Sequence, residues 1–261
     1  MDRRASVVAL VLAACAGGPR STARTTVVAR GTLAYAVAFC GDQLATIELG
    51  ERFELVVRRA DGGPPLARAD LGPPELDWTA LACDATRAWI GGETGEVRGF
   101  ELASGAEVAR WPIGAPVTSV LFASGAPGAI AIADASGVLC LRRRDGALLQ
   151  CVAAHDGAIA ALELDGERLI SRDRNGAARG WTLPSLASSE PAAAGPRWQG
   201  DRVRAVGRRV ERLRGRGWEN VATLAGTVRG IAVGPAGTLA IAAWIGSLDD
   251  ASVVLIRPGR Q

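Results

Sequence analysis

The chain has 261 residues, of which 48% are hydrophobic and 22% are charged, and its formal net charge is +3. This composition excludes an intrinsically disordered chain and a bundle of membrane helices, and it suits one large all-β domain or two small domains. All 30 basic residues are arginine, which excludes chemistry that requires a lysine, such as Schiff-base formation.

The N-terminal residues have the organisation of an export signal. Arg3 and Arg4 precede a short apolar run, which ends in Leu-Ala-Ala before Cys15. This arrangement resembles a bacterial lipoprotein signal. The resemblance implies that residues 1–14 are removed, that the new N-terminal cysteine is lipidated, and that residues 15–23 form a linker. The protein is then expected to be anchored to the bacterial membrane and to face the periplasm or the cell surface. An ordinary cleaved signal peptide is the alternative, and it also predicts export.

The rest of the chain repeats with a period near 40 residues. Glycine-rich turns separate short apolar segments throughout, and the second unit, for example, divides into expected strands at 79–83, 88–92, 97–102 and 107–111. The period is typical of a propeller blade, so we predict a six-bladed β-propeller of four-stranded blades over residues 24–261. A two-sheet sandwich is the alternative architecture. The bulky residues that define the repeat are Val57, Phe100, Leu141, Trp181, Trp218 and Leu255.

The two ends of the repeated region are expected to join. The last unit lacks a fourth strand, whereas the strand-like segment 24–29 lies before the first unit. We predict that this N-terminal strand completes the last blade and closes the ring, because closure pairs sheet edges that would otherwise be exposed. The fifth unit is the least regular, with strands expected at 196–199, 202–206, 210–218 and 221–224.

One unit carries a recognisable signature. From His155 to Trp181 the sequence gives a histidine, an apolar strand, a turn, Leu-Ile-Ser171, an Asp-Arg-Asn175-Gly turn and a tryptophan. This order resembles a WD repeat, with asparagine in place of the usual aspartate and one turn two residues shorter. The resemblance implies a structural network in which the histidine, serine, asparagine and tryptophan tie the strands of a blade together.

The five cysteines contain no Cys-x-x-Cys pair, which disfavours metal knuckles and thioredoxin-like chemistry. Cys40 and Cys83 end equivalent strands of successive units, and we expect them to be small buried apolar residues. Cys140 and Cys151 face each other across a hairpin that turns at Asp145-Gly146. An exported compartment permits a disulfide there. However, counting from the turn places the pair at a hydrogen-bonded site with Cα atoms about 5.5 Å apart, so the disulfide is left open.

Few residues offer catalytic chemistry. His155 is the only histidine, which excludes zinc sites with two or three histidines. It could act as a base with Asp156 or Asp173, but its place in the repeat favours the structural role. No nucleophile elbow, dinucleotide-binding or zinc-protease motif occurs. We therefore predict no catalytic residues, no metal and no cofactor.

The strongest surface signal is a run of arginines. Arg202 and Arg204 alternate at strand period, and Arg208, Arg209, Arg212 and Arg214 follow in the same unit. These residues predict a surface for an anionic partner, because guanidinium groups bind carboxylates and phosphates well. The alternative is a solvated outer strand. Nucleic acid is not expected for an exported domain with so small a net charge.

These observations favour a non-enzymatic WD-repeat-like propeller that acts as a protein-interaction scaffold in the cell envelope, with membrane contact through the lipid anchor only. The alternative is a propeller hydrolase or lactonase that uses carboxylates or a metal at the central mouth. Acidic residues converging on the axis would favour the enzyme, whereas an uncharged or arginine-lined mouth would count against it.

Overall fold

The computed structural model of the chain describes residues 24–30, 32–123, 128–165, 167–189, 203–206, 208–214, 217–224, 227–234, 238–244 and 252–257. All regular elements of these ranges are β-strands, numbered β1 to β23. No helix long and apolar enough to cross a bilayer occurs in the described part of the chain. The predicted signal, the linker and Cys15 lie outside the described residues.

Five of the sheets have four antiparallel strands each, and we call them blades. Blade 1 comprises β2 (Leu33–Cys40), β3 (Gln43–Leu49), β4 (Phe53–Arg59) and β5 (Ala67–Gly72). Blade 2 comprises β6 (Trp78–Cys83), β7 (Arg87–Gly92), β8 (Glu96–Glu101) and β9 (Glu107–Pro112). Blade 3 comprises β10 (Val117–Ala123), β11 (Ala129–Asp134), β12 (Val138–Arg143) and β13 (Leu148–Ala153). Blade 4 comprises β14 (Ile159–Asp165), β15 (Arg168–Asp173), β16 (Ala178–Thr182) and β17 (Ala187–Ser189).

The fifth, closing blade joins the two ends of the described chain. It comprises β21 (Thr227–Val233), β22 (Leu239–Trp244), β23 (Ser252–Arg257) and β1 (Arg24–Arg30). β1 runs antiparallel to β23 and places Thr26 opposite Leu255. The N-terminal strand therefore supplies the fourth strand of this blade. Closure of the whole ring stays a prediction, because residues 190–202, which follow blade 4, lie outside the described residues.

The prediction of six four-stranded blades is wrong, because the described residues form five four-stranded blades and one smaller sheet. The smaller sheet has three strands among the described residues, β18 (Val203–Val206), β19 (Arg209–Arg214) and β20 (Gly217–Thr223). The expected strand 210–218 is wrong, because the chain turns between the paired residues Arg214 and Gly217. The segment from Gly217 to Thr223 then forms one strand that includes most of the expected fourth strand. The expected strand at 196–199 lies outside the described residues.

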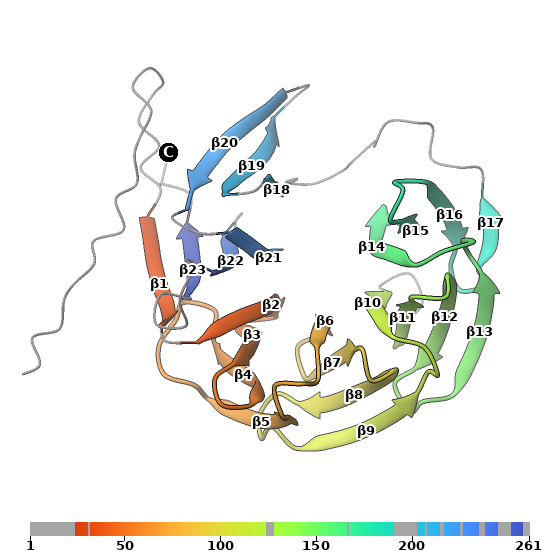
Figure 1. The fold of residues 1–261 in the computed structure, drawn as a ribbon, viewed down its shortest axis with the longest axis horizontal. Coiled ribbons are helices and arrows are strands. Elements are labelled where there is room, and N and C mark those ends of the chain that lie inside the picture. Colours follow the sequence, from red (N-terminus) through yellow and green to blue (C-terminus); the bar gives the residue numbers. More distant parts are fainter. Residues whose placement is uncertain are drawn as a thin grey trace, which may run out of the picture.

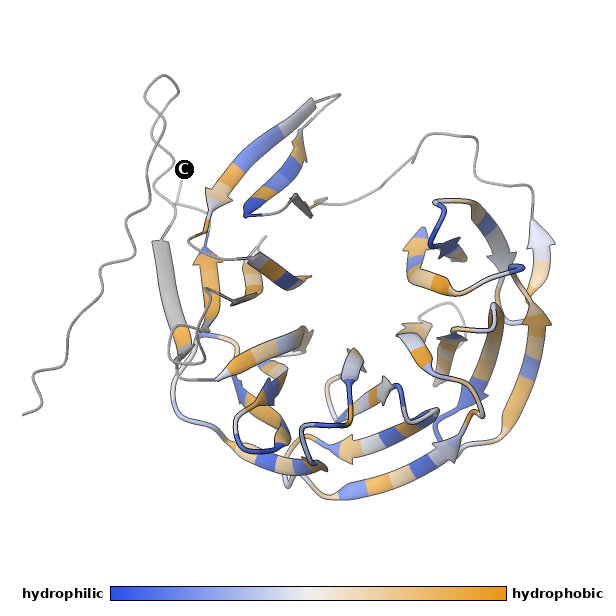
Figure 2. Cartoon of the chain, in the orientation of Figure 1, coloured by the Kyte–Doolittle hydropathy of each residue, from blue (hydrophilic) through white to orange (hydrophobic). Residues whose placement is uncertain are grey.

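The sheets are set around a central axis (Figure 1). The first strand of each blade is innermost, and the first strands of blades 1, 2, 3 and the closing blade pack beside one another at the hub. Apolar residues alternate with polar ones along many strands (Figure 2). Because successive side chains point to opposite faces of a sheet, this alternation gives a sheet an apolar face that can pack against a neighbouring sheet. Separate apolar clusters join blade 1 to blade 2, blade 2 to blade 3, blade 3 to blade 4, and the closing blade to its two neighbours.

The cysteines form two disulfides in the structure. Cys40 and Cys83 are joined between blades 1 and 2, with Cα atoms 5.4 Å apart, so the expectation of two separate apolar thiols is wrong. Their equivalent positions at the ends of neighbouring inner strands bring them together. Cys140 and Cys151 are also joined, with Cα atoms 4.1 Å apart. The expected spacing of 5.5 Å is wrong because a bulge at Leu149 changes the pairing between the turn and the cysteines.

Candidate functional site

The inner strands share one irregularity. In each of the five blades, the first strand carries a β-bulge where it pairs with the second, so that one residue has no partner across the pair. A bulge changes the direction in which a side chain points, and bulges are frequent next to binding sites. We call these five residues the bulge ring. They are Tyr35, Thr79, Thr118, Ala160 and Arg229.

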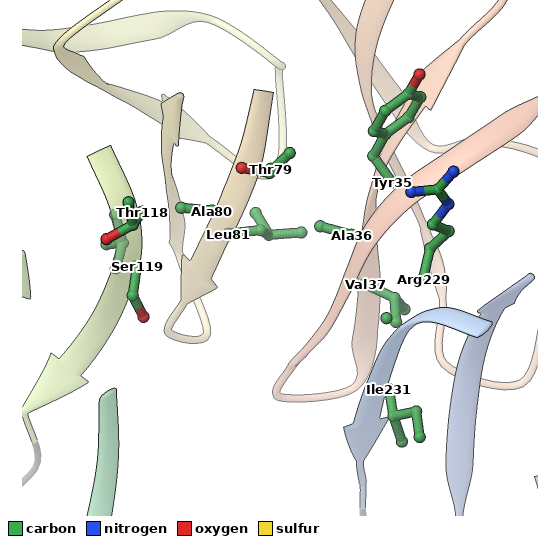
Figure 3. A pocket seen from close by; sticks show the side chains of 12 residues that line it. Tyr35, Ala36, Val37, Thr79, Ala80, Leu81, Thr118, Ser119, Arg229 and Ile231 are labelled. Carbon is green, nitrogen blue, oxygen red and sulfur yellow. The ribbon is translucent and has the colours of Figure 1, made fainter. Parts of the chain in front are cut away.

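Four members of the bulge ring line a pocket at the hub. The pocket has a volume of about 190 Å³ and lies between β2, β6, β10 and β21 (Figure 3). Small residues follow the bulge residues and form much of the rest of its wall, among them Ala36, Ala80 and Ser119. Ala160, the bulge residue of blade 4, is exposed but is not part of the wall. The pocket therefore collects side chains from segments about 40 to 190 residues apart in sequence.

Charged groups lie beside this pocket. The pKa of the Asp77 carboxyl is raised, first by burial and second by the charge of Glu93, while Arg229 opposes both effects. The pKa of Tyr35 is also raised, mainly by burial and then by Asp77. The Oδ1 atom of Asp77 is buried and has no hydrogen-bond partner among the described residues. The wall of the pocket thus offers hydroxyl groups and one guanidinium, and the Asp77 carboxyl lies within electrostatic range of Tyr35 and Arg229.

The WD-like unit forms a buried network in blade 4. The Nε1 atom of Trp181 donates a hydrogen bond of 2.8 Å to Oγ of Ser171, and Nε2 of His155 lies 2.8 Å from the same oxygen. All three residues are buried. Because an indole nitrogen can only donate, the serine hydroxyl accepts from the tryptophan and can donate to a neutral histidine. The single histidine is therefore engaged in the blade interior, away from the hub pocket.

Asp173, rather than the predicted Asn175, completes this network. Its carboxylate lies 3.9 Å from Nδ1 of His155, and its Oδ1 accepts hydrogen bonds from the amides of Asn175 (2.9 Å) and Ala177 (2.8 Å). The aspartate thereby shapes the turn, which leaves the Asn175 side chain exposed. Asp134 makes the same type of turn in blade 3, where its Oδ1 accepts from the amide of Val138 at 3.0 Å.

Burial sets the protonation of the histidine. The pKa of His155 is lowered, first by burial and then by the charge of Arg179, although Asp173 acts in the opposite direction. The ring is therefore held in its neutral form at neutral pH. This state suits a structural hydrogen bond to Ser171.

The predicted arginine surface is not one continuous stripe. Arg208 and Arg209 are exposed, but Arg212 is only 9% exposed, so the prediction that it projects from the surface is wrong. The physical reason is the strand period: Arg212 follows Val210 by two residues on β19, and Val210 is buried in the apolar cluster shared with the closing blade. Arg204 and Arg214 lie on β18 and β19, and Arg202 lies outside the described residues.

Other possible sites offer less. Within the described ranges, no three His, Cys, Asp or Glu side chains are grouped so that they could hold a metal ion. A second pocket of about 300 Å³ lies between blades 1 and 2, but each of its charged side chains is held in an ion pair. Arg52 lies 2.8 Å from Asp70 there, and Arg110 lies 3.4 Å from Glu96.

Comparison with solved structures identifies the class of fold. The WD40 repeats of RRP9 match with a TM-score of 0.73 and 12% identity, over 90% of this chain and 97% of that chain. U3-55K matches with a TM-score of 0.72 and 13% identity, over 89% and 98%. The WD40 propeller domain of Doa1 matches with a TM-score of 0.54 and 14% identity, over 91% and 98%. The chain therefore has the fold of a WD40 β-propeller. Neither a protein-family model nor a curated protein matches the sequence.

Sequence reasoning missed the bulge ring. No glycine or proline occupies the five bulge positions, and the residue types there differ. One common signal was available, because a small residue follows each of them: Ala36, Ala80, Ser119, Ala161 and Gly230. A Cβ atom added at Gly230 would lie 3.4 Å from the Cα of Ala36, at van der Waals contact, so β21 and β2 run close together at this point.

Proposed function

We propose that the chain is a non-enzymatic scaffold of the bacterial cell envelope, which binds a protein partner through the hub pocket and the bulge ring. The observation that carries the proposal is the pocket itself. Its volume of about 190 Å³ is smaller than the roughly 300–1,000 Å³ typical of small-molecule sites. A single side chain inserted from a partner protein fits such a pocket better than a whole small substrate.

The groups around the pocket favour recognition over catalysis. Its charged wall residue is Arg229, and its polar groups are mostly hydroxyls. Hydroxyl and guanidinium groups orient a bound polar side chain through hydrogen bonds. A hydrolase would use acidic groups converging on the axis, whereas Asp77 and Glu93 lie beside the pocket and are not part of its wall.

The envelope location rests on two further features. Residues 1–14 and Cys15 have the pattern of a lipoprotein signal, and the two disulfides suit an oxidising compartment. In this proposal residues 15–23 form a linker between the lipid and the propeller that spans 24–261. We propose that the five blades and the three-stranded sheet close into one ring, in which β1 completes the closing blade. A Cys15→Ser substitution should release the protein from membranes, and unchanged membrane association would refute lipidation.

The binding role can be tested by capture from solubilised envelopes. Thr79→Arg places a long charged side chain in the hub pocket, whereas Ala160→Arg makes the same change at the equivalent bulge outside the pocket wall. We expect the first variant to lose the co-purified partner and the second to retain it, with both showing the thermal unfolding of the natural protein. Retention of the same partner by the Thr79→Arg variant would contradict docking at the hub.

A further inference from the structure

The two disulfides lie in different surroundings. Cys40 is fully buried, and Cys83 packs, partly buried, against the same apolar cluster between blades 1 and 2. Cys140 is 9% exposed, but its partner Cys151 is exposed on β13, the outermost strand of blade 3 (Figure 1). A thiolate cleaves a disulfide only if it can reach one of the two sulfur atoms. The bond between β12 and β13 is therefore the one that a thiol can reach from solvent.

The side chains of β13 do little to hold this strand. In blades 1 and 2 the outer strand buries a large apolar residue, Leu71 on β5 and Trp111 on β9. None of the six residues of β13 is buried, and Val152 alone packs, partly buried, against an apolar cluster. A segment with few buried apolar contacts opens at a low cost in free energy. The disulfide thus supplies a link that the outer strands of blades 1 and 2 obtain from packing.

The covalent link lies at a single point of the hairpin. Cys140 and Cys151 are directly opposite each other in the pairing of β12 with β13. Between this pair and the turn, the bulge at Leu149 interrupts the pairing, and Leu148 and Leu149 are 54% and 45% exposed. These two leucines therefore contribute little to stability through burial. Cleavage of the disulfide leaves β13 attached to its sheet by the backbone hydrogen bonds to β12.

We propose that the bond between Cys140 and Cys151 is a redox-sensitive link that holds the outer strand of blade 3, and that Cys151 is the site at which a dithiol reductant reacts. A thiolate of the reductant attacks Sγ of Cys151, the bond between the two cysteine sulfurs breaks, and Cys140 leaves as a thiolate. The second thiol of the reductant then attacks the mixed disulfide and releases Cys151. Both protons of the dithiol pass to the cysteines, the chain gains two electrons, and the reductant is oxidised to a disulfide. This inference goes beyond the proposed scaffold and does not depend on binding at the hub pocket.

Partial reduction of the folded protein tests the difference in access. The full chain would carry Cys15→Ser, so that its remaining cysteines are those of the two disulfides. Dithiothreitol would be added under native conditions, and the thiols released with time would be alkylated and located by peptide mass mapping. The bond between Cys140 and Cys151 should be reduced at least about tenfold faster than the bond between Cys40 and Cys83, which is the internal control. Equal rates, or faster reduction of the buried bond, would overturn the inference.

Single substitutions in the same protein identify the sulfur that is attacked. Cys140→Ser leaves Cys151 as a free thiol in its exposed position, whereas Cys151→Ser leaves Cys140 as a free thiol that is 9% exposed. Dithiodipyridine would be used as the probe, because its reaction with a thiol releases a coloured product. Cys151 should react at least about tenfold faster than Cys140. The reverse order, or equal rates, would contradict the assignment of Cys151.

Hydrogen exchange tests whether the bond holds the strand. The amides of residues 148–153 that pair with β12 should exchange at least about tenfold faster after partial reduction, while residues 67–72 and 107–112, in the outer strands of blades 1 and 2, should not change. The double substitution Cys140→Ser and Cys151→Ser should give the same increase without any reductant. Unchanged exchange in residues 148–153 would overturn the inference. Faster exchange in all blades would also overturn it, because the bond would then support the whole fold rather than one strand.

Discussion

Blades 2 and 4 are each stabilised by different interactions at equivalent positions of the repeat. Phe100 in β8 and Trp181 in β16 each lie opposite the residue twelve positions earlier, Ala88 and Leu169. In blade 4 the indole of Trp181 donates to Ser171, and a neutral hydrogen-bonded network results. In blade 2 the aromatic ring has no donor, and the guanidinium of Arg98 lies 5.0 Å from the centre of the Phe100 ring instead.

Arg98 also connects two blades. Its Nη1 donates to the carbonyl of Leu71 in blade 1 at 3.0 Å, and its Nε donates to Glu107 in β9 at 2.9 Å. The same guanidinium lies 5.6 Å from the centre of the Trp78 ring. The comparison shows that one position in the repeat can be stabilised by a neutral network or by a charged residue packed between aromatic rings. A search for the WD signature alone therefore finds only blade 4.

The largest expected effect comes from removing the shared aromatic group. Phe100 is 1% exposed and belongs to the apolar cluster between blades 1 and 2. Phe100→Ala should lower the free energy of unfolding by about 3–5 kcal/mol, because a large cavity remains. Urea denaturation would measure the change, with Trp218→Ala in the three-stranded sheet as the exposed-aromatic control. A loss below about 1 kcal/mol for Phe100→Ala would contradict the proposed packing between blades.

The network of blade 4 can be broken at its centre. Ser171→Ala leaves two buried groups, the Trp181 N–H and the His155 ring nitrogen, without their common partner. We expect a loss of about 2–3 kcal/mol in unfolding free energy, since each unsatisfied buried polar group costs roughly 1–3 kcal/mol. Ser171→Thr keeps the hydroxyl and serves as the comparison in the same assay. A loss in Ser171→Ala no larger than that in Ser171→Thr would show that the hydroxyl is unimportant.

The charged link of blade 2 should matter less. Arg98→Met keeps much of the apolar stem but removes the hydrogen bonds to Leu71 and Glu107. Glu107 is partly exposed and retains Arg110 at 2.8 Å, so it is not left without a partner. We expect a loss of about 1–2 kcal/mol, measured by thermal unfolding. If Arg98→Met lowers the unfolding free energy as much as Phe100→Ala or more, the charged link contributes more than the apolar core to the packing between blades 1 and 2.

The smallest expected effect is a pH dependence of stability that comes from blade 4, because the single histidine lies in its network. The folded pKa of His155 is lowered from 6.5, mainly by burial, so the unfolded chain binds the proton more readily. Its contribution to stability is full above the unfolded pKa and is lost as the pH falls through that value toward the folded pKa. The difference in melting temperature between the natural protein and His155→Gln should therefore shrink from about pH 7.5 to about pH 5.5. A constant difference would show that this histidine does not titrate between the folded and unfolded states.

The contrast between repeats also explains what the sequence could predict. The interval of about 40 residues that separates Phe100, Leu141 and Trp181 in turn reflects packing at blade seams, and it predicted the sheets well in blades 1 to 4. The exchange of roles between Asn175 and Asp173 depends on turn geometry, which spacing alone does not specify. Trp218 fits the repeat interval, but it lies on β20, the peripheral strand of its sheet, where most residues are exposed. The bulge ring was missed because it interrupts the alternation that defines a strand.

The central claim is that the bulge residues at the hub contact a partner, and photo-crosslinking tests it most directly. A benzophenone side chain would replace Thr79 in the pocket wall and, in a matched protein, Ala160 outside it. Irradiation of intact cells should give one crosslinked partner band from position 79 and none from position 160. No band from position 79, or the same band from both positions, would contradict the claim.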